Sequence, residues 1–150
     1  MTQISNEAEF RHALAGLDAD RQRAVAALFV KHVLPLCDDE RIAPVTDVAA
    51  REDVPEDKLA EALRTARTTT TDCHARCGAA GDWSAQAGYF VARAAVAALT
   101  PAGQMPGGPA WQAAMASRMA KTCAAIVTCD DSLGRDSEEQ YRILVDFVNS

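Results

Sequence analysis

The sequence predicts an all-α fold, a compact bundle of about five or six helices with no sheet. Alanine accounts for 31 of the 150 residues. It has the highest helix propensity because it loses no side-chain entropy in a helix, and its small side chain lets helix axes approach closely. Two alanine-rich stretches, residues 92–99 and 110–125, show no strand-like alternation. We therefore expect a tightly packed helical protein.

The first two helices are predicted by a cap and by hydrophobic spacing. Ser5 is a suitable N-cap for a short helix whose apolar residues lie three and four positions apart. A longer helix with one apolar side is expected over residues 20–37, and Pro35 is expected to kink or end it. Residues 38–55 hold an acidic cluster and two prolines. We expect them to be the least regular part of the chain, with a single helical turn at residues 49–51.

A third helix is predicted to begin at Pro55, whose fixed φ suits the first helical position. Asp82 is expected to cap a fourth helix over residues 83–99, which Thr100 and Pro101 end. The third helix carries an apolar stripe in steps of four and three residues, which predicts a buried face. The stripe consists of Leu59, Leu63, Ala66, Thr70, Cys73 and Cys77.

Pro109 is expected to begin a fifth helix after a flexible loop at residues 100–109. Two adjacent apolar stripes predict that this helix is central in the bundle. The residues Ser137-Glu138-Glu139-Gln140 form a capping box and are expected to open a last amphipathic helix. The two stripes of the fifth helix are Met115, Met119, Thr122, Ile126 and Cys129, and Ala116, Ala120, Cys123 and Val127.

Length and charge limit the classes of function. A chain of 150 residues predicts one domain, residues 1–150. The net charge of −6 argues against nucleic-acid binding, which requires clustered Lys and Arg.

No charge-free window of 18 residues is present, so we expect no membrane-spanning helix. Residues 1–7 lack the features of a signal peptide, and the five cysteines are expected to be reduced thiols of a cytoplasmic protein.

The sequence contains no recognisable catalytic constellation. A cysteine nucleophile needs a base within reach, but Cys73 and His74 are adjacent residues and diverge by about 100° on a helix. No glycine-rich phosphate loop follows a strand, because no strand is predicted. We assign no catalytic residue and no cofactor, and we expect a non-catalytic binding protein.

A metal-binding helical bundle is the alternative function, with cysteine thiolates as ligands for zinc or copper. Cys73 and Cys77 are four residues apart and point the same way on a helix, whereas Cys123 and Cys129 are six apart and diverge. Cys73 and Cys77 also continue the apolar stripe of the third helix, so buried core thiols are the preferred interpretation and no metal ligand is assigned. The residues of this alternative are Cys73, Cys77, Cys123, Cys129 and His74.

A protein partner is expected to contact the acidic segment 38–53 and the loop at residues 100–109. An acidic surface accelerates encounter with a basic protein. Homodimerisation through an alanine-rich face is the other association that the composition suggests. The acidic residues of the segment are Asp38, Asp39, Glu40, Asp47, Glu52 and Asp53.

Residues 20–36, which end in Val33-Leu34-Pro35-Leu36, resemble the opening helix of the alanine-rich immunity proteins of bacterial polymorphic toxin systems. The segments that follow it in that family are an acidic one with proline, Ala/Arg-rich helices and a Glu-rich last helix. They correspond here to residues 37–39, 59–67, 92–99 and 138–148. The resemblance implies a bacterial helical protein that binds and blocks a cognate toxin stoichiometrically. With the acidic net charge, it suggests a basic toxin domain as the partner, and it supplies no catalytic residues.

Overall fold

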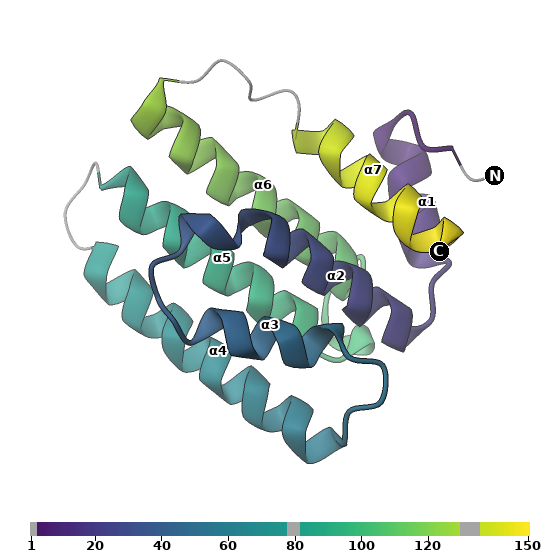
Figure 1. Ribbon diagram of the computed structural model, residues 1–150, viewed down its shortest axis with the longest axis horizontal. Helices are drawn as coiled ribbons and strands as arrows, with labels where there is room; N and C mark the ends of the chain where they lie inside the picture. Colours follow the sequence, from purple (N-terminus) through teal and green to yellow (C-terminus); the bar gives the residue numbers. More distant parts are fainter. Residues whose placement is uncertain (1–2, 78–81, 130–135) are drawn as a thin grey trace.

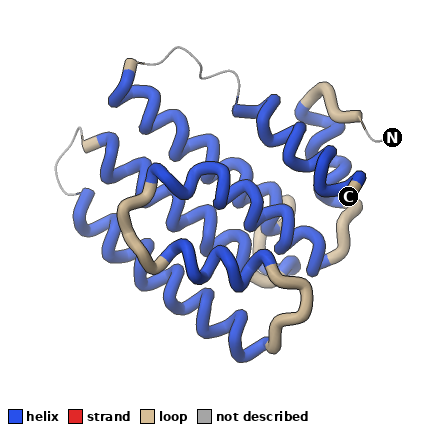
Figure 2. The backbone as a smooth tube through the Cα atoms, viewed as in Figure 1, coloured by secondary structure: helices blue, strands red, loops and turns tan. Residues whose placement is uncertain are grey.

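The computed structural model describes residues 3–77, 82–129 and 136–150. Within these residues the chain forms seven α-helices and two short 3-10 helices and no strand (Figures 1 and 2), so the all-α prediction is confirmed. No helix in this part of the chain is both long and apolar enough to cross a bilayer. The elements are α1 Glu7–Ala15, α2 Ala19–Val33, η1 Leu34–Leu36, α3 Ile42–Ala50, α4 Glu56–Cys77, α5 Trp83–Leu99, η2 Ala102–Gln104, α6 Pro109–Thr128 and α7 Asp136–Asn149.

Acidic or amide side chains cap three of the helices. The cap of α1 is Asn6 rather than Ser5: its Oδ1 accepts a hydrogen bond from the Glu9 amide at 2.9 Å, whereas the Ser5 hydroxyl donates to the Glu9 carboxylate at 2.8 Å. Asp18 and Asp82 each accept a hydrogen bond from the amide three residues later, at the starts of α2 and α5. The predicted cap at Asp82 is therefore confirmed.

Helix α3 occupies the segment that the sequence predicted to be least regular, so that prediction is wrong for residues 42–50. Pro44 is the third residue of α3, where its missing N–H removes no intrahelical hydrogen bond. The buried residues of α3 follow the spacing i, i+3, i+4 and i+7 and are Ile42, Val45, Thr46 and Ala49. Burial of this face stabilises a helix that local sequence signals do not predict.

Arg23 of α2 satisfies the carbonyl groups at the C-terminal end of α3. Its guanidinium donates to the carbonyl oxygens of Ala49 at 3.2 Å, Arg51 at 2.7 Å and Glu52 at 3.1 Å. A cation at this end of a helix also interacts favourably with the helix dipole. Residues 49–52 are thereby held against α2 by a buried arginine that lies 26 or more positions earlier in the chain.

Helices α4, α5 and α6 form one layer with α5 in the middle (Figure 1). Helix α2 packs on α5 and α6, and α3 packs on α4 and α5, both on the same face of this layer. Helix α7 lies along α2, with Glu139 beside His32 near the C-terminal end of α2 and Phe147 beside Arg21 near its N-terminal end, and α1 packs on α6 and α7. Buried hydrophobic residues from all seven helices belong to one cluster.

Alanine makes the close packing of the layer possible, as the composition predicted. Helices α5 and α6 approach each other along more of their length than any other pair of described helices. Small side chains keep the distance between two helix axes at the short end of the usual 8–10 Å. The buried alanines are Ala87, Ala92, Ala94, Ala95, Ala97 and Ala98 of α5 and Ala110, Ala113, Ala114 and Ala120 of α6.

Two predicted stripes differ from the structure. In α6, Ala120 and Cys123 are buried, but the exposed fractions of Met119, Ile126 and Val127 are 45%, 44% and 51%. The prediction of two buried stripes on α6 is therefore wrong, because none of the described helices covers its outer side. In α4 the buried residues are Ala62, Ala66, Thr69 and Cys73, whereas Leu59, Leu63, Thr70 and Cys77 of the predicted stripe are half-buried.

The last helix begins at Asp136, which places Ser137 inside its first turn.

Enlarging a buried alanine of α5 tests the role of small residues in the layer. We expect Ala95→Leu to destabilise the protein by about 1–3 kcal/mol, because the extra atoms overpack a site that is 1% exposed. The free energy of unfolding from urea denaturation measures this effect. The control is Ala75→Leu at an exposed position of α4, for which we expect a change within about 0.5 kcal/mol. Equal stability of the two variants would contradict the packing argument.

Candidate functional site

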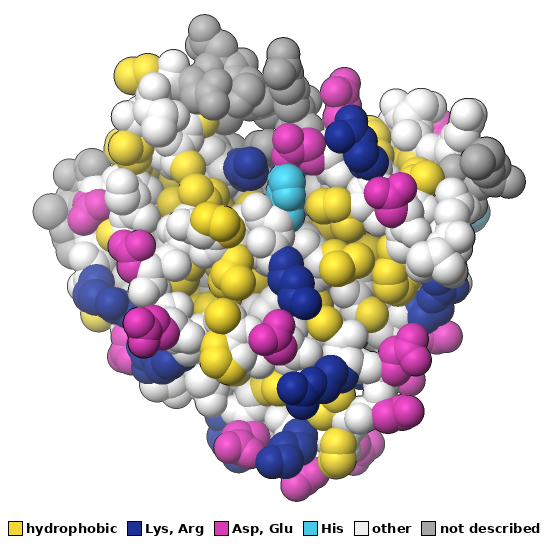
Figure 3. All heavy atoms as spheres, viewed as in Figure 1, with side chains coloured by type: hydrophobic (Ala, Val, Ile, Leu, Met, Phe, Trp, Pro, Cys, Tyr) yellow, Lys and Arg dark blue, Asp and Glu magenta, His cyan; other side chains and the backbone are white. Residues whose placement is uncertain are grey.

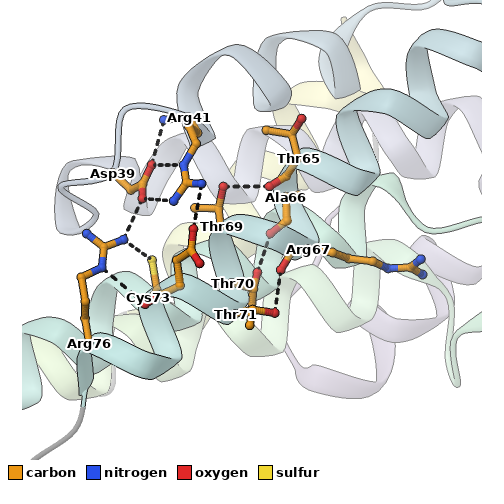
Figure 4. A network of polar contacts seen from close by, with 11 residues as sticks. Asp39, Arg41, Thr65, Ala66, Arg67, Thr69, Thr70, Thr71, Cys73 and Arg76 are labelled. Atoms are coloured by element: carbon orange, nitrogen blue, oxygen red, sulfur yellow. Dashed lines mark hydrogen bonds and ion pairs between the residues drawn. The ribbon is translucent and has the colours of Figure 1, made fainter.

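The acidic segment predicted as a contact surface is partly neutralised by the protein itself. The carboxylate of Asp39 accepts hydrogen bonds from Arg41 Nε at 2.9 Å, from Arg41 Nη2 at 2.8 Å and from Arg76 Nη2 at 2.8 Å. Arg41 also donates to Asp72 of α4 at 2.9 Å (Figure 4). The Asp39 side chain is only 9% exposed. Asp39 therefore links the segment before α3 to α4 and is not available to a partner.

The hydrogen bonds from Arg41 hold the pKa of Asp39 well below its usual range, and those from Arg76 act in the same direction. The same contact, together with Asp72, raises the pKa of Arg41. Both groups are thus ionised at neutral pH, and the carboxylate has two arginine partners. The cluster has a structural role in joining residues 39–41 to the C-terminal half of α4.

The other predicted acidic residues do not gather into one strongly negative surface. Asp47 pairs with Lys31 at 3.6 Å. On the face formed by α2 and α3, acidic and basic side chains are interspersed among hydrophobic ones (Figure 3). Asp39 apart, the acidic residues of the segment are exposed, namely Asp38, Glu40, Asp47, Glu52 and Asp53, and of these Asp47 has a lysine partner. The structure thus leaves only part of the predicted surface available for contact with a basic partner.

The residues of the metal-binding alternative lie in different places. Cys73 lines a small hollow together with Cys37, a residue that the sequence did not single out. Cys123 is buried, whereas Cys129 is exposed at the end of α6 with φ of 54°. The ring of His74 packs against a tyrosine, with 5.2 Å between the ring centroids. Among the described residues there is no group of three or more His, Cys, Asp or Glu side chains placed to hold a metal ion.

Burial also disfavours the thiolate form of four cysteines. Desolvation raises the pKa of Cys37, Cys73, Cys77 and Cys123 above the ordinary thiol value. A thiolate is the nucleophilic and metal-binding form. At neutral pH these side chains are therefore protonated and act as small apolar groups, in line with the preferred interpretation of the sequence.

The most prominent candidate site is an open groove of about 510 Å³ along the outer side of α5, which we name the methionine groove. Its floor is formed by α5, its walls by α4 and α6, and one end by the loop before α6. The protein contains four methionines, and all except Met1 line this groove. Its lining residues are Arg67, Thr70, Thr71, Tyr89, Phe90, Arg93, Val96, Ala97, Met105, Gln112, Met115, Ala116 and Met119.

The groove exists because α5 is covered on only three sides. Helices α4 and α6 flank it, and α2 and α3 cover one face. The residues that α5 buries there, such as Val91 and Ala95, lie about half a helical turn from the groove residues Tyr89 and Arg93. The fourth side of α5 thus presents an amphipathic surface between two parallel walls.

The polar groups of the groove have one sign of charge. Arg67 and Arg93 line it, and no Asp or Glu among the described residues does. The Arg93 guanidinium lies 5.8 Å from the ring centroids of both Tyr89 and Phe90, which places it over the aromatic wall. In Figure 4, Arg67 extends away from the cluster of Asp39, so it is not drawn into that network. The groove is therefore apolar with a cationic edge, although the whole chain is acidic.

One end of the groove belongs to the loop that the sequence predicted as a contact surface. Gln112 Nε2 donates to the Pro106 carbonyl at 2.7 Å and so ties the loop to α6. Met105 of this loop lines the groove. The sequence identified the loop, Met115 and Met119, but it placed the two methionines in the core. An apolar stripe on a helix has the same sequence pattern whether another helix covers it or it lines a groove. The sequence pattern therefore could not predict the groove.

A second hollow of about 560 Å³ lies at the opposite edge of α4, lined by Leu59, Leu63 and Ala98 among others. Its arginine, Arg23, is already bound to the carbonyl groups at the end of α3. A binding site needs a few polar groups that are free to orient a ligand. The methionine groove meets this requirement better, because two arginines with no ion pair among the described residues line it.

Comparisons with models of protein families, with curated protein sequences and with solved structures gave no match for this chain. The assignment of a site therefore depends on the geometry and chemistry described above.

Removing the carboxylate of Asp39 tests its structural role. We expect Asp39→Asn to destabilise the protein by about 1–3 kcal/mol at pH 7, because a weakly exposed charge-assisted network loses its acceptor. Since the pKa of Asp39 is lower in the folded state, its contribution is present above the unfolded pKa of about 3.9 and is lost as the pH falls through the folded pKa. The difference between variant and wild type should therefore shrink from about pH 5 downward.

Urea denaturation across this pH range gives the free energies of unfolding. The control is Asp38→Asn, which removes one negative charge at the neighbouring exposed position. A difference that stays constant from pH 7 to pH 2, or an equal effect of the control, would refute the role of Asp39.

Proposed function

We propose that the protein is a non-catalytic binding protein and that it binds a helix of another protein in the methionine groove. The observation that carries this proposal is the uncovered side of α5, which is lined by three methionines, two aromatic residues and two arginines. An apolar groove between helices is a common site for an amphipathic helix, which inserts its apolar face.

The opposite face of the same layer supports a helix as the occupant. There α2 lies on α5 and α6, and α3 lies on α4 and α5. The three-helix layer thus already accepts helices against its surface by ordinary helix packing. A partner helix in the methionine groove would cover α5 on its fourth side in the same manner.

Methionine suits such a surface because its side chain is flexible and polarizable. It fills irregular gaps and adapts to different partners, and methionine-rich surfaces are typical of proteins that bind helices. Met119 has an exposed fraction of 45%. A large exposed apolar side chain gains free energy when a partner removes it from water.

The lining also favours binding over catalysis. The described part of the chain contributes no carboxylate, imidazole, thiol or lysine to it, and these are the groups that most often act as general base or nucleophile. Tyr89 and the two arginines can donate hydrogen bonds or stabilise an anion. A groove of this composition holds a ligand without providing a group to attack it.

The resemblance to immunity proteins fits this proposal as one form of it. A helix of a toxin domain held in the methionine groove would be blocked by occupancy, without turnover. A cognate toxin, its basic charge and a bacterial, cytoplasmic setting remain predictions from the sequence. Binding of the purified chain to the product of a neighbouring toxin-like gene, with loss of toxin activity at equimolar ratio, is the result expected for this form.

The fluorescent probe 1-anilinonaphthalene-8-sulfonate tests whether the groove is an accessible apolar site in the native protein. We expect saturable binding to wild type. The double variant Met115→Gln/Met119→Gln should weaken it by about tenfold, which corresponds to about 1.4 kcal/mol of lost apolar contact. Glutamine replaces methionine at similar length and leaves the charge unchanged.

The matched control is Ile126→Gln/Val127→Gln, which changes two residues of the same helix with exposed fractions of 44% and 51% that do not line the groove. Its affinity for the probe should equal that of wild type. Circular dichroism at the assay temperature verifies that all three proteins are folded. Equal weakening by both double variants, or no saturable binding to wild type, would contradict the groove as the recognition site.

A further inference from the structure

We infer that the helix bound in the methionine groove is acidic along one edge, and that its carboxylates pair with Arg67 and Arg93. This inference rests on the proposed function and specifies the chemistry of the partner. It differs from the basic partner that the acidic composition predicted. The reason is that the local charge of the groove, rather than the net charge of the chain, faces the bound helix.

The two arginines come from neighbouring helices, Arg67 from one wall of the groove and Arg93 from its floor. Arg67 belongs to α4, whose Thr70 and Thr71 also line the groove, and Arg93 belongs to α5. The methionines Met115 and Met119 lie on α6, which forms the other wall. A helix with an apolar stripe toward α6 and carboxylates toward α4 would match both walls at once.

The polar groups around the arginines leave them available to a ligand. The hydroxyl of Thr70 donates to the Ala66 carbonyl at 2.7 Å, and that of Thr71 donates to the Arg67 carbonyl at 3.1 Å. These hydroxyls therefore serve α4 itself. The Arg93 guanidinium lies 5.8 Å from the ring centroids of Tyr89 and Phe90, and this contact leaves its N–H groups able to form bidentate bonds with a carboxylate.

The size of the groove sets the length of the contact. Tyr89 and Ala97 are eight residues apart on α5, which is about 12 Å at 1.5 Å per residue. A bound helix is thus contacted over about two turns. Two turns present two or three apolar anchors at the spacing i, i+3 or i+4, and i+7, with one or two acidic residues beside them.

Because the net charge of the chain is −6, attraction between a peptide and the whole protein can be distinguished from pairing with the two arginines. The field of the whole protein favours a basic peptide over an acidic one. A preference for an acidic helix can therefore arise only from a local cationic site.

Two synthetic helical peptides of 18 residues provide the test. Both carry a fluorescein label and the same stripe of leucines. In each helical turn, the two positions that flank the stripe are Glu in one peptide and Lys in the other. Fluorescence anisotropy in low-salt buffer measures their dissociation constants. Because exposed ion pairs contribute modestly, we expect wild type to bind the Glu peptide about three- to thirtyfold more tightly than the Lys peptide.

The charge-reversed double variant Arg67→Glu/Arg93→Glu should invert this preference. The control Arg64→Glu/Arg142→Glu changes the net charge equally at exposed positions that do not line the groove, and it should keep the preference for the Glu peptide. Circular dichroism checks that each variant is folded.

The outcomes separate this inference from the proposed function. If neither peptide binds wild type, the docking of a helix is wrong and the proposed function fails with it. If both peptides bind equally, or the Lys peptide binds more tightly, the groove binds helices but the inferred acidic edge is wrong. If dodecanoate binds more tightly than the Glu peptide and displaces it, the occupant is a small anionic amphiphile and the helix is excluded.

Discussion

The close approach of α5 to α4 and α6 is the constraint on which the rest of the structure depends. It is possible because α5 buries six alanines and no side chain larger than leucine. The layer that results has two faces, and on each of them α5 lies between α4 and α6. Helices α2 and α3 fill one face and complete the core. None of the helices in residues 3–77, 82–129 and 136–150 covers the other face, so the same packing that stabilises the fold creates the methionine groove.

Two arginines with weakly exposed side chains attach the remaining elements to this layer. Arg23 joins the end of α3 to α2 through three backbone carbonyls. Arg118 of α6 donates to Gln140 of α7 at 2.7 Å and to Glu7 of α1 at 2.8 Å, and so links the two ends of the chain. Each guanidinium offers several donors in a rigid plane. One residue can therefore bind two or three partners that are distant in the sequence.

The arginines of the groove differ from these in one respect that bears on function. Arg23, Arg41, Arg76 and Arg118 bind acids or carbonyls within the protein. Arg67 and Arg93 instead line the methionine groove, to which the described residues contribute no acid. Under the proposed function, structural and recognition roles are divided among chemically identical side chains. The same division applies to the acidic residues, because Asp39 serves the fold while its neighbours Asp38 and Glu40 are exposed. Net charge alone is a poor guide to the charge that a partner meets.

The sequence by itself determined the all-α class, the starts of α4, α5 and α6 at proline or aspartate, and the alanine-based packing, because propensity and capping act within a few residues. The tertiary structure alone decided that residues 42–50 form a helix, since that helix depends on burial and on Arg23. It also decided that Met115 and Met119 line a groove instead of being fully buried, and that Asp39 is bound by Arg41 and Arg76. Helical periodicity shows which residues share a face, but whether another helix covers that face depends on contacts between distant segments.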